Sequence, residues 1–267
     1  MLIRKPCVSG TFYPASKEGL MKELEKFVTE PGKKEKEVFG AISPHAGYMY
    51  SGRVAGVVFS NIKIPNRVVI LNPNHRGIGP DVSVFPEGRW EFPGFSVDID
   101  EEIVSYLSQN PLFVKNSSAH EEEHSGEVQV PFIWFKNRTT RFAFITIRTL
   151  KKNILQDVGM YLSKLKRDFP EIIFVSSSDM NHYEPDDISR EKDKKAIDKI
   201  LSLDAEGLLS TVLNHNISMC GIAPVASLLF AAKDYGVKSA ELVAYTNSGE
   251  VSGDKSAVVG YAGFILL

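Results

Sequence analysis

Apolar residues in this chain are concentrated in short continuous runs that are separated by longer segments of mixed polarity. Most of the runs are rich in Val, Ile and Phe and do not alternate with polar residues, which is typical of strands buried on both faces. The pattern therefore predicts a sheet covered by helices, with strands near 38–43, 67–72, 82–86, 141–147, 172–176, 240–245 and 257–266.

The segments between these runs have the residue spacing of helices. Ser16 is expected to cap a helix over 17–29, and Asp100 is expected to cap one over 101–109. Asn153 is expected to cap the amphipathic segment ILQDVGMYLSKLKRD that follows it. Further helices are expected across 52–61, 125–136, 187–201, 204–213 and 221–235.

This alternation predicts one α/β domain with a mixed, mainly parallel sheet sandwiched by helices. Two segments that contain Pro and Gly, TEPGKKEKE (29–37) and FPEGRWEFPGF (85–95), are interpreted as loops. Composition does not shift across either of them, and we find no internal repeat and no low-complexity segment. The whole chain, 1–267, is therefore expected to be a single domain.

Composition limits the possible partners. The chain has 43% hydrophobic and 24% charged residues, which is ordinary for a globular protein. A formal net charge of -2 and a pI near 6.3 give no basic surface for nucleic acid or an anionic membrane. The N-terminal sequence lacks the apolar core of a signal peptide, and no apolar stretch approaches the length of a membrane span. A cytoplasmic location is therefore expected, in which Cys7 and Cys220 are free thiols.

Three of the apolar runs lead directly to a histidine. FGAIS leads to His45, RVVIL leads to His75, and IIFVSSSD leads to Asp179 and His182. In open α/β sheets, ligands bind in the crevice outside the carboxyl ends of the strands. Any one of these histidines is more simply explained as a hydrogen-bonded loop residue. Three of the six histidines at equivalent strand ends favour a metal site, because imidazole is a good ligand for divalent metals.

A fourth candidate is Cys220, in SMCGIAPVASLLFAA. It precedes a strongly apolar helical segment, whose first backbone N–H groups and dipole would stabilise a thiolate. Such a thiolate can bind a metal or act as a nucleophile, whereas the alternative is an inert buried cysteine. For Cys7, which lies near the start of the sequence and is flanked by Pro6, the inert buried cysteine is the preferred interpretation.

His124 and Glu127 lie three residues apart at the start of a predicted helix, and so on one face of it. Lining a pocket and capping the helix are equally supported for this pair. His120 and His215 are interpreted as surface or loop residues. The chain has no GxxxxGK[ST] phosphate loop and no GxSxG nucleophile elbow, so a serine hydrolase is not expected.

Several ordered blocks, spread over essentially the whole chain, resemble the Memo family, whose members are also known as protein B of the AmmeMemoRadiSam system. They are GTFYP, PHAGYMYSG, NPNH, EEHSGEVQVPF, SSSDMNHY, MCGIAP and GDKSAVVGYAGF. Memo proteins are similar in fold to class III extradiol ring-cleaving dioxygenases, which hold Fe(II) with two histidines and a glutamate. The resemblance implies that fold for this chain.

By the same resemblance, His45 and His75 take the two histidine positions, and Cys220 stands where those enzymes have their glutamate. His182 takes the position of their acid–base histidine, with Asp179 beside it. The cysteine is a departure that matters, because a thiolate favours copper(I) or zinc more than a carboxylate does and can itself be oxidised. Iron or copper is the expected metal, and zinc is a further option.

Two hypotheses follow. The first is a metal-dependent oxidoreductase of the extradiol-dioxygenase type, in a pathway with a radical SAM enzyme and an AMMECR-type partner. The second is a non-enzymatic protein that binds a metal, a small molecule or a peptide in the same pocket. Asp179 and His182 favour the first, because a metal binder needs no proton-transfer group. The exchange of glutamate for Cys220 favours the second.

Overall fold

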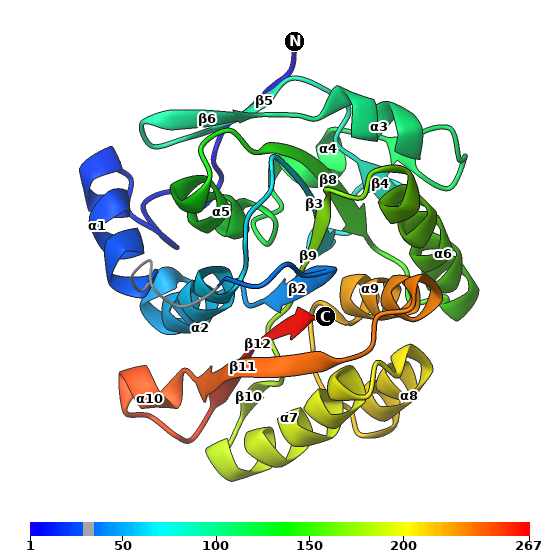
Figure 1. The fold of residues 1–267 in the computed structure, drawn as a ribbon. Coiled ribbons are helices and arrows are strands. Elements are labelled where there is room, and N and C mark those ends of the chain that lie inside the picture. The colour runs from blue at the N-terminus through cyan, green and yellow to red at the C-terminus, as the bar shows by residue number, and fades with distance from the viewer. Residues whose placement is uncertain (29–34) are drawn as a thin grey trace.

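Helices cover both faces of one large mixed sheet, as the apolar runs predicted (Figure 1). The structure, a computed structural model, describes residues 1–28 and 35–267. The end of the helix expected over 17–29 and most of the loop expected over 29–37 fall in residues 29–34, which lie outside the described residues.

The large sheet has nine strands, in the order β10-β12-β2-β9-β3-β8-β4-β7, with β11 also paired to β12. The neighbouring strands β2, β9, β3 and β8 are parallel. The flanking strands β12 and β4 are antiparallel to β2 and β8 respectively, so the sheet is mixed. Its strands are β2 (Gly40–Ser43), β3 (Arg67–Pro73), β4 (Val82–Val84), β7 (Val114–Lys115), β8 (Arg141–Ile147), β9 (Ile173–Ser177), β10 (His182–Glu184), β11 (Ala240–Asn247) and β12 (Val258–Leu266).

The parallel strands are buried almost from end to end, which explains why they appear in the sequence as continuous apolar runs. In the pairing of β2 with β9, Ser43 lies opposite Ser177. In the pairing of β9 with β3, Ser176 lies opposite Leu71. The carboxyl ends of β2, β9 and β3 therefore meet at the same edge of the sheet, and the segments that follow them come close together there.

Two groups of helices form the outer layers of the domain (Figure 1). On one side α2 packs on β2 and β12, with α1 and α5 beside it. On the other side α9 packs on β3, β8 and β9, and α6 and α8 pack on α9. The helices are α1 (Lys17–Phe27), α2 (Tyr48–Asn61), α3 (Glu101–Leu107), α4 (Ser118–Glu121), the 3-10 helix η1 (Glu127–Gln129), α5 (Val130–Lys136), α6 (Lys152–Asp168), α7 (Asp186–Leu201), α8 (Ala205–Asn214), α9 (Ile222–Tyr235) and α10 (Gly249–Ser252).

Two of the three predicted helix caps are present. The side chain of Ser16 accepts a hydrogen bond from the Gly19 N–H, and that of Asp100 accepts one from the Ile103 N–H. The cap predicted at Asn153 is wrong, because α6 already begins at Lys152 and Asn153 lies inside its first turn. The apolar periodicity predicted this helix correctly but placed its first residue too late in the sequence.

The segment 85–95 was expected to be a loop, and this expectation is wrong in part. It contains β5 (Arg89–Phe92) and the start of β6 (Phe95–Asp98), which form an antiparallel hairpin beside β1 (Ile3–Arg4). Gly94 has a φ of +78°, which a glycine adopts readily in so tight a turn. β5 alternates between half-buried and buried positions, so it lacks the continuous apolar run by which the other strands were recognised.

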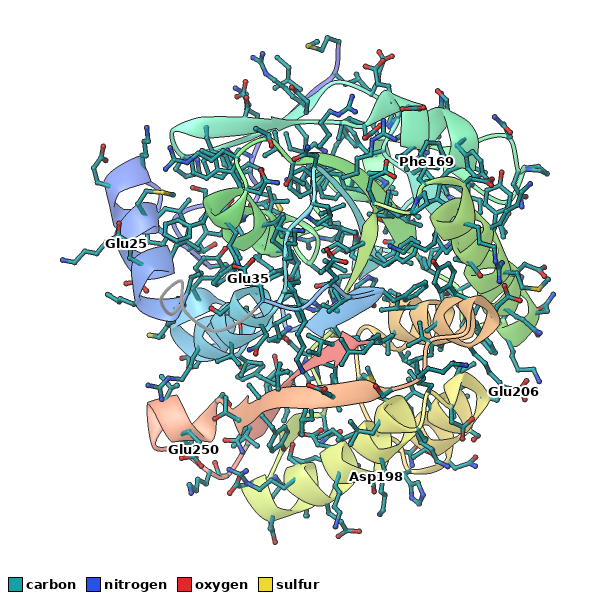
Figure 2. All side chains as sticks on the ribbon, viewed as in Figure 1. Glu25, Glu35, Phe169, Asp198, Glu206 and Glu250 are labelled. Atoms are coloured by element: carbon teal, nitrogen blue, oxygen red, sulfur yellow. The ribbon has the colours of Figure 1, made fainter. Side chains whose placement is uncertain are left out.

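The aromatic ring of Trp90 in β5 attaches this small sheet to the large one. It stacks on Phe144 of β8 with ring centroids 3.6 Å apart, and it is almost fully buried. Figure 2 shows charged side chains such as Glu25, Asp198 and Glu206 at the periphery of the molecule. In the described part of the chain, no helix combines the length and apolar character that a membrane crossing requires.

Candidate metal centre

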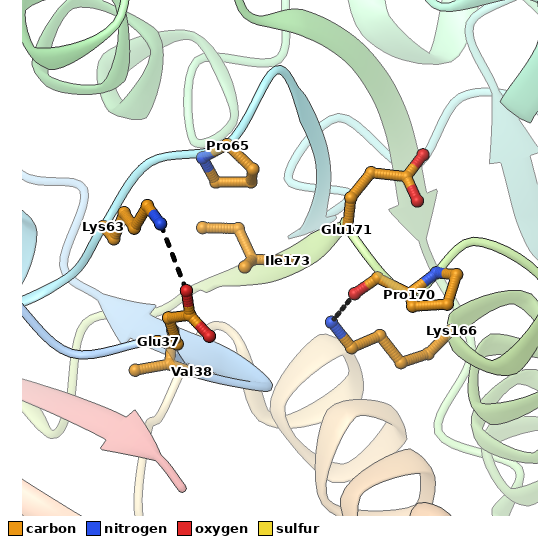
Figure 3. A pocket seen from close by; sticks show the side chains of 8 residues that line it. All are labelled: Glu37, Val38, Lys63, Pro65, Lys166, Pro170, Glu171 and Ile173. Atoms are coloured by element: carbon orange, nitrogen blue, oxygen red, sulfur yellow. Dashed lines mark hydrogen bonds and ion pairs between the residues drawn. The ribbon is translucent and has the colours of Figure 1, made fainter.

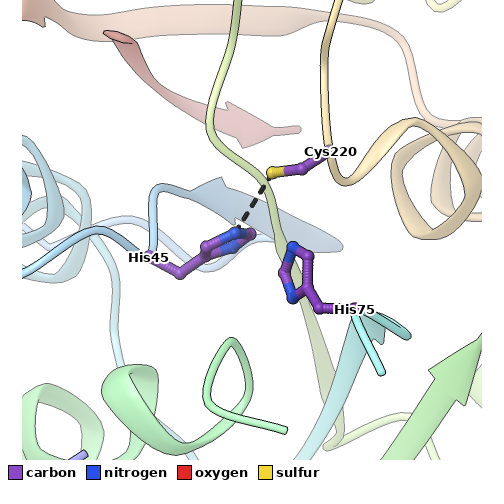
Figure 4. Close-up of side chains that lie close together, drawn as sticks. All are labelled: His45, His75 and Cys220. Carbon is purple, nitrogen blue, oxygen red and sulfur yellow. Dashed lines mark hydrogen bonds between the residues drawn. The ribbon is translucent and has the colours of Figure 1, made fainter. Parts of the chain in front are cut away.

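His45, His75 and Cys220 lie together at the carboxyl edge of the parallel strands (Figure 4). One potential ligand atom from each residue lies within 4.8 Å of the others. His45 and His75 follow β2 and β3, and Cys220 precedes α9, so the group joins segments from three separate regions of the sequence. The His45 Nε2 and the Cys220 Sγ lie 3.1 Å apart.

The ring of His45 is fixed by Ser177, the last residue of β9. The Ser177 hydroxyl lies 2.7 Å from the Ser125 carbonyl oxygen, to which it donates, and it accepts a hydrogen bond from the Gln129 Nε2 at 2.9 Å. Its remaining lone pair faces the His45 Nδ1 at 2.9 Å. Because the one hydroxyl proton is already used, the His45 Nδ1 must donate. The lone pair of the neutral ring is therefore on Nε2, which faces Cys220.

Glu123 fixes the ring of His75 in the same way. The Glu123 Oε1 lies 2.9 Å from the His75 Nδ1, and its Oε2 accepts the His75 backbone N–H at 2.6 Å. An ionised carboxylate can only accept, so the His75 Nδ1 donates, and in the neutral ring the lone pair is on Nε2. This is the arrangement in which a carboxylate orients a metal-binding histidine and raises its basicity.

The charge on Glu123 is stabilised by these contacts. Burial alone would raise the pKa of its carboxyl group, but the hydrogen bonds from His75 and Ser125 outweigh it and lower the pKa to about 2. Glu123 is 2% exposed, so solvent does little to screen this interaction. A permanently ionised acceptor behind His75 keeps its imidazole in the tautomer that binds a metal through Nε2.

The sequence led us to expect a stabilised thiolate at Cys220, but the surroundings of its sulfur favour the neutral thiol. Burial, followed by the nearby Asp179 carboxyl group, raises the pKa of the Cys220 thiol, although the Asp179 N–H donates to its sulfur at 3.3 Å. The start of α9 therefore does not compensate for the loss of solvent around the sulfur. The neutral thiol is the stable form in the chain by itself, and a metal that binds there has to release its proton.

Asp179 fixes the loop of His45 and also faces the cavity. Its Oδ1 accepts the His45 backbone N–H at 2.7 Å. Burial raises the pKa of the Asp179 carboxyl group to about 7, against the opposing effect of the N–H groups of His45 and Ala46. The resemblance placed Asp179 beside His182, and in the structure its carboxyl group holds the backbone that presents His45.

A cavity of about 630 Å³ opens in front of this group. His45, His75, His124, Asp179 and His182 line it, so the histidines delivered by three different strands face one space. Burial lowers the pKa of His182, which favours its neutral ring near neutral pH. The cavity is also lined by four aromatic residues, Phe12, Tyr50, Tyr183 and Tyr261.

His124 and Glu127, which the sequence placed on one helix face, are separated by the structure. His124 lines the cavity and stacks on His75, with ring centroids 4.9 Å apart. Burial lowers the pKa of His124 to about 4. Glu127 is fully buried away from the cavity, where it pairs with Arg4 at 2.6 Å and accepts the Tyr13 hydroxyl. The pocket-lining role proposed for Glu127 is therefore wrong.

Three further expectations concern residues outside the site. His120 was interpreted as a surface or loop residue, and this is wrong: it is fully buried, 3.0 Å from the Thr146 Oγ1. Cys7 was interpreted as buried, whereas it is exposed. His215 is exposed just beyond the end of α8, as expected.

His75, Glu123 and His124 form a second group whose potential ligand atoms lie within 4.8 Å of one another. A metal bound there through Glu123 would compete with the hydrogen bonds that its carboxylate accepts from His75 and Ser125. The group of His45, His75 and Cys220 needs no such rearrangement, so it is the better candidate. Glu123 was not singled out from the sequence, although it is adjacent to His124, because its burial and its contacts with His75 arise only in the fold.

Another cavity, of about 230 Å³, lies at the opposite edge of the parallel strands (Figure 3). Each charged side chain that lines it has a partner, and Glu171 pairs with Arg67 at 3.3 Å. Lys63 pairs with Glu37 at 3.1 Å, and Lys166 donates to the Pro170 carbonyl oxygen at 2.6 Å. This cavity lies at the amino ends of the strands, away from the histidines, and shows no chemical grouping of its own.

The fold and the site define a mixed α/β protein with a His–His–Cys group at the carboxyl edge of its parallel strands. Residues 4–265 match the family described as Memo-like protein, and the chain belongs to that family. A MEMO1 family protein from Ignicoccus hospitalis is 41% identical over 281 residues, which cover 98% of each chain. A MEMO1 family protein from Aquifex aeolicus is 37% identical over the full length of both chains.

Among solved structures, the chain is similar to the uncharacterized protein JW3007 from Escherichia coli K12. The TM-score is 0.56 and the sequence identity is 11%, with 85% of this chain and 98% of that chain covered. At this identity the likeness concerns the fold alone. It agrees with a mixed sheet between layers of helices.

Proposed function

We propose that His45, His75 and Cys220 hold a transition metal and that the protein is a metal-dependent oxidoreductase with a pocket similar to that of extradiol dioxygenases. The observation that carries the proposal is the state of the two imidazoles: each donates its Nδ1–H, to Ser177 or to Glu123, which leaves the Nε2 of each ring to bind a metal beside the thiol. Two imidazoles and a thiolate suit iron, copper or zinc. Such a metal would polarise a bound substrate and, in the case of iron or copper, supply a redox couple.

Chain residues around the proposed metal supply the remaining functions. His182 lines the same cavity and is not one of the three grouped ligands, so its imidazole is available to take or give a proton. Asp179 holds the loop of His45 and so fixes the ring against Cys220.

The first test is metal content. Protein purified without added metal or chelating resin should contain a near-stoichiometric amount of iron, copper or zinc when analysed by mass spectrometry. Apoprotein should regain one of these metals when it is titrated with each. Protein that carries only trace metal and binds none of the three would contradict the proposal.

The second test separates an enzyme from a binding protein. Metal-loaded protein is incubated with a panel of catechols, and with thiol or ascorbate as reductant, while dissolved oxygen is recorded. Oxygen consumption above that of the same amount of free metal supports an oxidoreductase. If iron- and copper-loaded protein both fail to exceed free metal, the cavity is instead a binding site for a metal with a small molecule or a peptide.

A further inference from the structure

Two loops that are about forty residues apart in sequence are joined beside the proposed metal site. The first runs from the end of β9 into β10 and includes Asp179 and also His182, the first residue of β10. The second lies between α8 and α9 and contains Cys220. One contact between the loops is the hydrogen bond from the Asp179 N–H to the Cys220 sulfur. A second set of hydrogen bonds between them involves Asn181 and Ser218.

Ser218 both accepts a hydrogen bond from the first loop and donates hydrogen bonds to it. Its hydroxyl oxygen accepts the His182 backbone N–H at 2.7 Å. The same hydroxyl lies 3.1 Å from the Asn181 Oδ1, and the Ser218 backbone N–H donates to that oxygen at 3.0 Å. Because a hydroxyl can donate one hydrogen bond while accepting another, all three contacts can form at the same time. Ser218 lies two residues before Cys220, so it connects the segment of the proposed ligand with that of His182.

Asn181 is rigidly held on the other side of this connection. It is fully buried, and its backbone N–H donates to the Asp193 Oδ1 at 2.8 Å. Its side-chain Nδ2 donates to the Glu184 Oε2 at 2.6 Å, which leaves the Oδ1 directed at Ser218. Asp193 belongs to α7 and also accepts the Tyr245 hydroxyl at 2.7 Å. The connection is therefore anchored to a helix and to β11.

The backbone beside His182 also needs to be held in place. Tyr183 has a φ of +60°, in the left-handed region that residues other than glycine rarely adopt. Its side chain is 77% exposed, so burial of the ring does not hold this conformation. A strained backbone persists when surrounding contacts determine it, and such residues cluster at functional sites. The hydrogen bond from the His182 N–H to Ser218 is directly adjacent to the strained residue.

From these contacts we infer that Asn181 and Ser218 are positioning residues that set the place of His182 relative to Cys220. The inference rests on the proposed function in assigning roles to His182 and Cys220, but the coupling of the two loops is a property of the chain alone. If the inference holds, a change at Ser218 alters the backbone around His182 as well as the Cys220 loop.

Ser218→Ala is the appropriate variant, because Ser218 is exposed and its hydroxyl can be removed without opening a cavity in the core. Ser218→Thr keeps the hydroxyl and should restore the wild-type behaviour. Ser210→Ala removes a comparable hydroxyl from an exposed position on α8, where it bonds only to the Gly207 carbonyl oxygen within its own helix. It is the matched control.

Amide hydrogen exchange of the metal-free protein tests the coupling directly. Ser218→Ala should speed exchange in the peptides that cover both 178–184 and 215–222, while Ser218→Thr and Ser210→Ala leave both at the wild-type rate. Faster exchange in 215–222 alone would overturn the inference, since the loops would then be independent. This measurement does not depend on whether the protein binds a metal.

A cobalt titration tests the consequence for the site. In wild-type protein a thiolate-to-cobalt charge-transfer band should report Cys220, and Ser218→Ala should weaken cobalt binding by up to roughly 10-fold, the lower end of the effect of losing a contact behind a ligand, because Ser218 holds the backbone two residues before Cys220 and does not touch its sulfur. Equal affinity and an unchanged band in Ser218→Ala would overturn the positioning role. Failure of the wild-type protein itself to bind cobalt would count against the proposed metal site, while the exchange experiment would still decide the coupling.

Discussion

Glu123 binds His75 at two points, the backbone N–H at 2.6 Å and the ring Nδ1 at 2.9 Å. One carboxylate thus fixes both the backbone and the side chain of a single residue. Rotation of the ring would break one bond and movement of the loop would break the other. The Nε2 of His75 is consequently held toward His45 and Cys220 before any metal binds, which reduces the entropy that binding has to remove.

The first prediction concerns this pair. Glu123→Gln keeps an oxygen acceptor but removes the charge that stabilises the Nδ1–H tautomer of His75, so metal affinity should fall roughly 10–100-fold. Affinity is measured by titrating apoprotein with zinc in competition with a chromophoric chelator. Glu122→Gln is the matched control, because Glu122 is the exposed neighbour of Glu123 and should leave the affinity unchanged. Equal affinities for the two variants would show that Glu123 does not support the site.

The second prediction concerns the proposed ligands. His45→Ala and His75→Ala should each remove most of the bound iron, copper or zinc, because only two protein ligands would remain. The fold should persist, since the core consists of apolar side chains that the site does not contribute to. Metal content and circular dichroism are measured on the same samples. His215→Ala, at an exposed histidine, should keep the wild-type metal content. A collapse of secondary structure on metal removal would indicate a structural ion instead.

The third prediction separates proton transfer from metal binding. His182→Ala should leave metal affinity nearly unchanged, because the ring lines the cavity without belonging to the ligand group. If the protein is an oxidoreductase, turnover should fall roughly 10²–10⁴-fold, the usual range for loss of a general acid or base. Both quantities are measured on protein loaded with the same metal. A parallel loss of metal would identify His182 as a ligand and contradict this assignment.

The fourth prediction concerns pH. Burial raises the pKa of the Asp193 carboxyl group from 3.8 to about 6, although the Asn181 N–H and Tyr245 hydroxyl oppose it. Between these values the folded state holds a proton that the unfolded state has lost, so stability falls as the pH rises through the folded-state pKa. A shift of this size corresponds to about 3 kcal/mol at most.

Asp193→Asn removes this titration while its side-chain oxygen can still accept the Asn181 N–H. Relative to the variant, the wild-type protein should therefore lose stability progressively between about pH 4 and pH 6, and the difference should level off above the folded-state pKa. Urea unfolding at several pH values measures the difference, and the other titrating groups cancel in the comparison. A difference between the two proteins that stays constant over this range would contradict the assignment of the shift to Asp193.

The sequence determined the general architecture, because that depends on patterns that are local along the chain. The continuous apolar runs of β3 and β8 marked buried strands, and polar caps such as Ser16 marked helix starts. The hairpin of β5 and β6 was missed because its alternating positions and its Gly94 turn sit in a segment that contains Pro and Gly. A half-buried hairpin has no continuous apolar run by which it could be recognised.

For the site, the sequence supplied His45, His75 and His182, because residues that follow buried strands gather at one edge of the sheet, and Cys220, because it precedes an apolar helix. Only the tertiary structure decided what surrounds them. In the structure, Glu123 accepts a hydrogen bond from the His75 ring, and Asp179 accepts one from the His45 backbone N–H. Glu127 forms a buried ion pair with Arg4. These outcomes depend on burial and on hydrogen bonds between segments far apart in the chain. The residue types present at each position do not encode them locally.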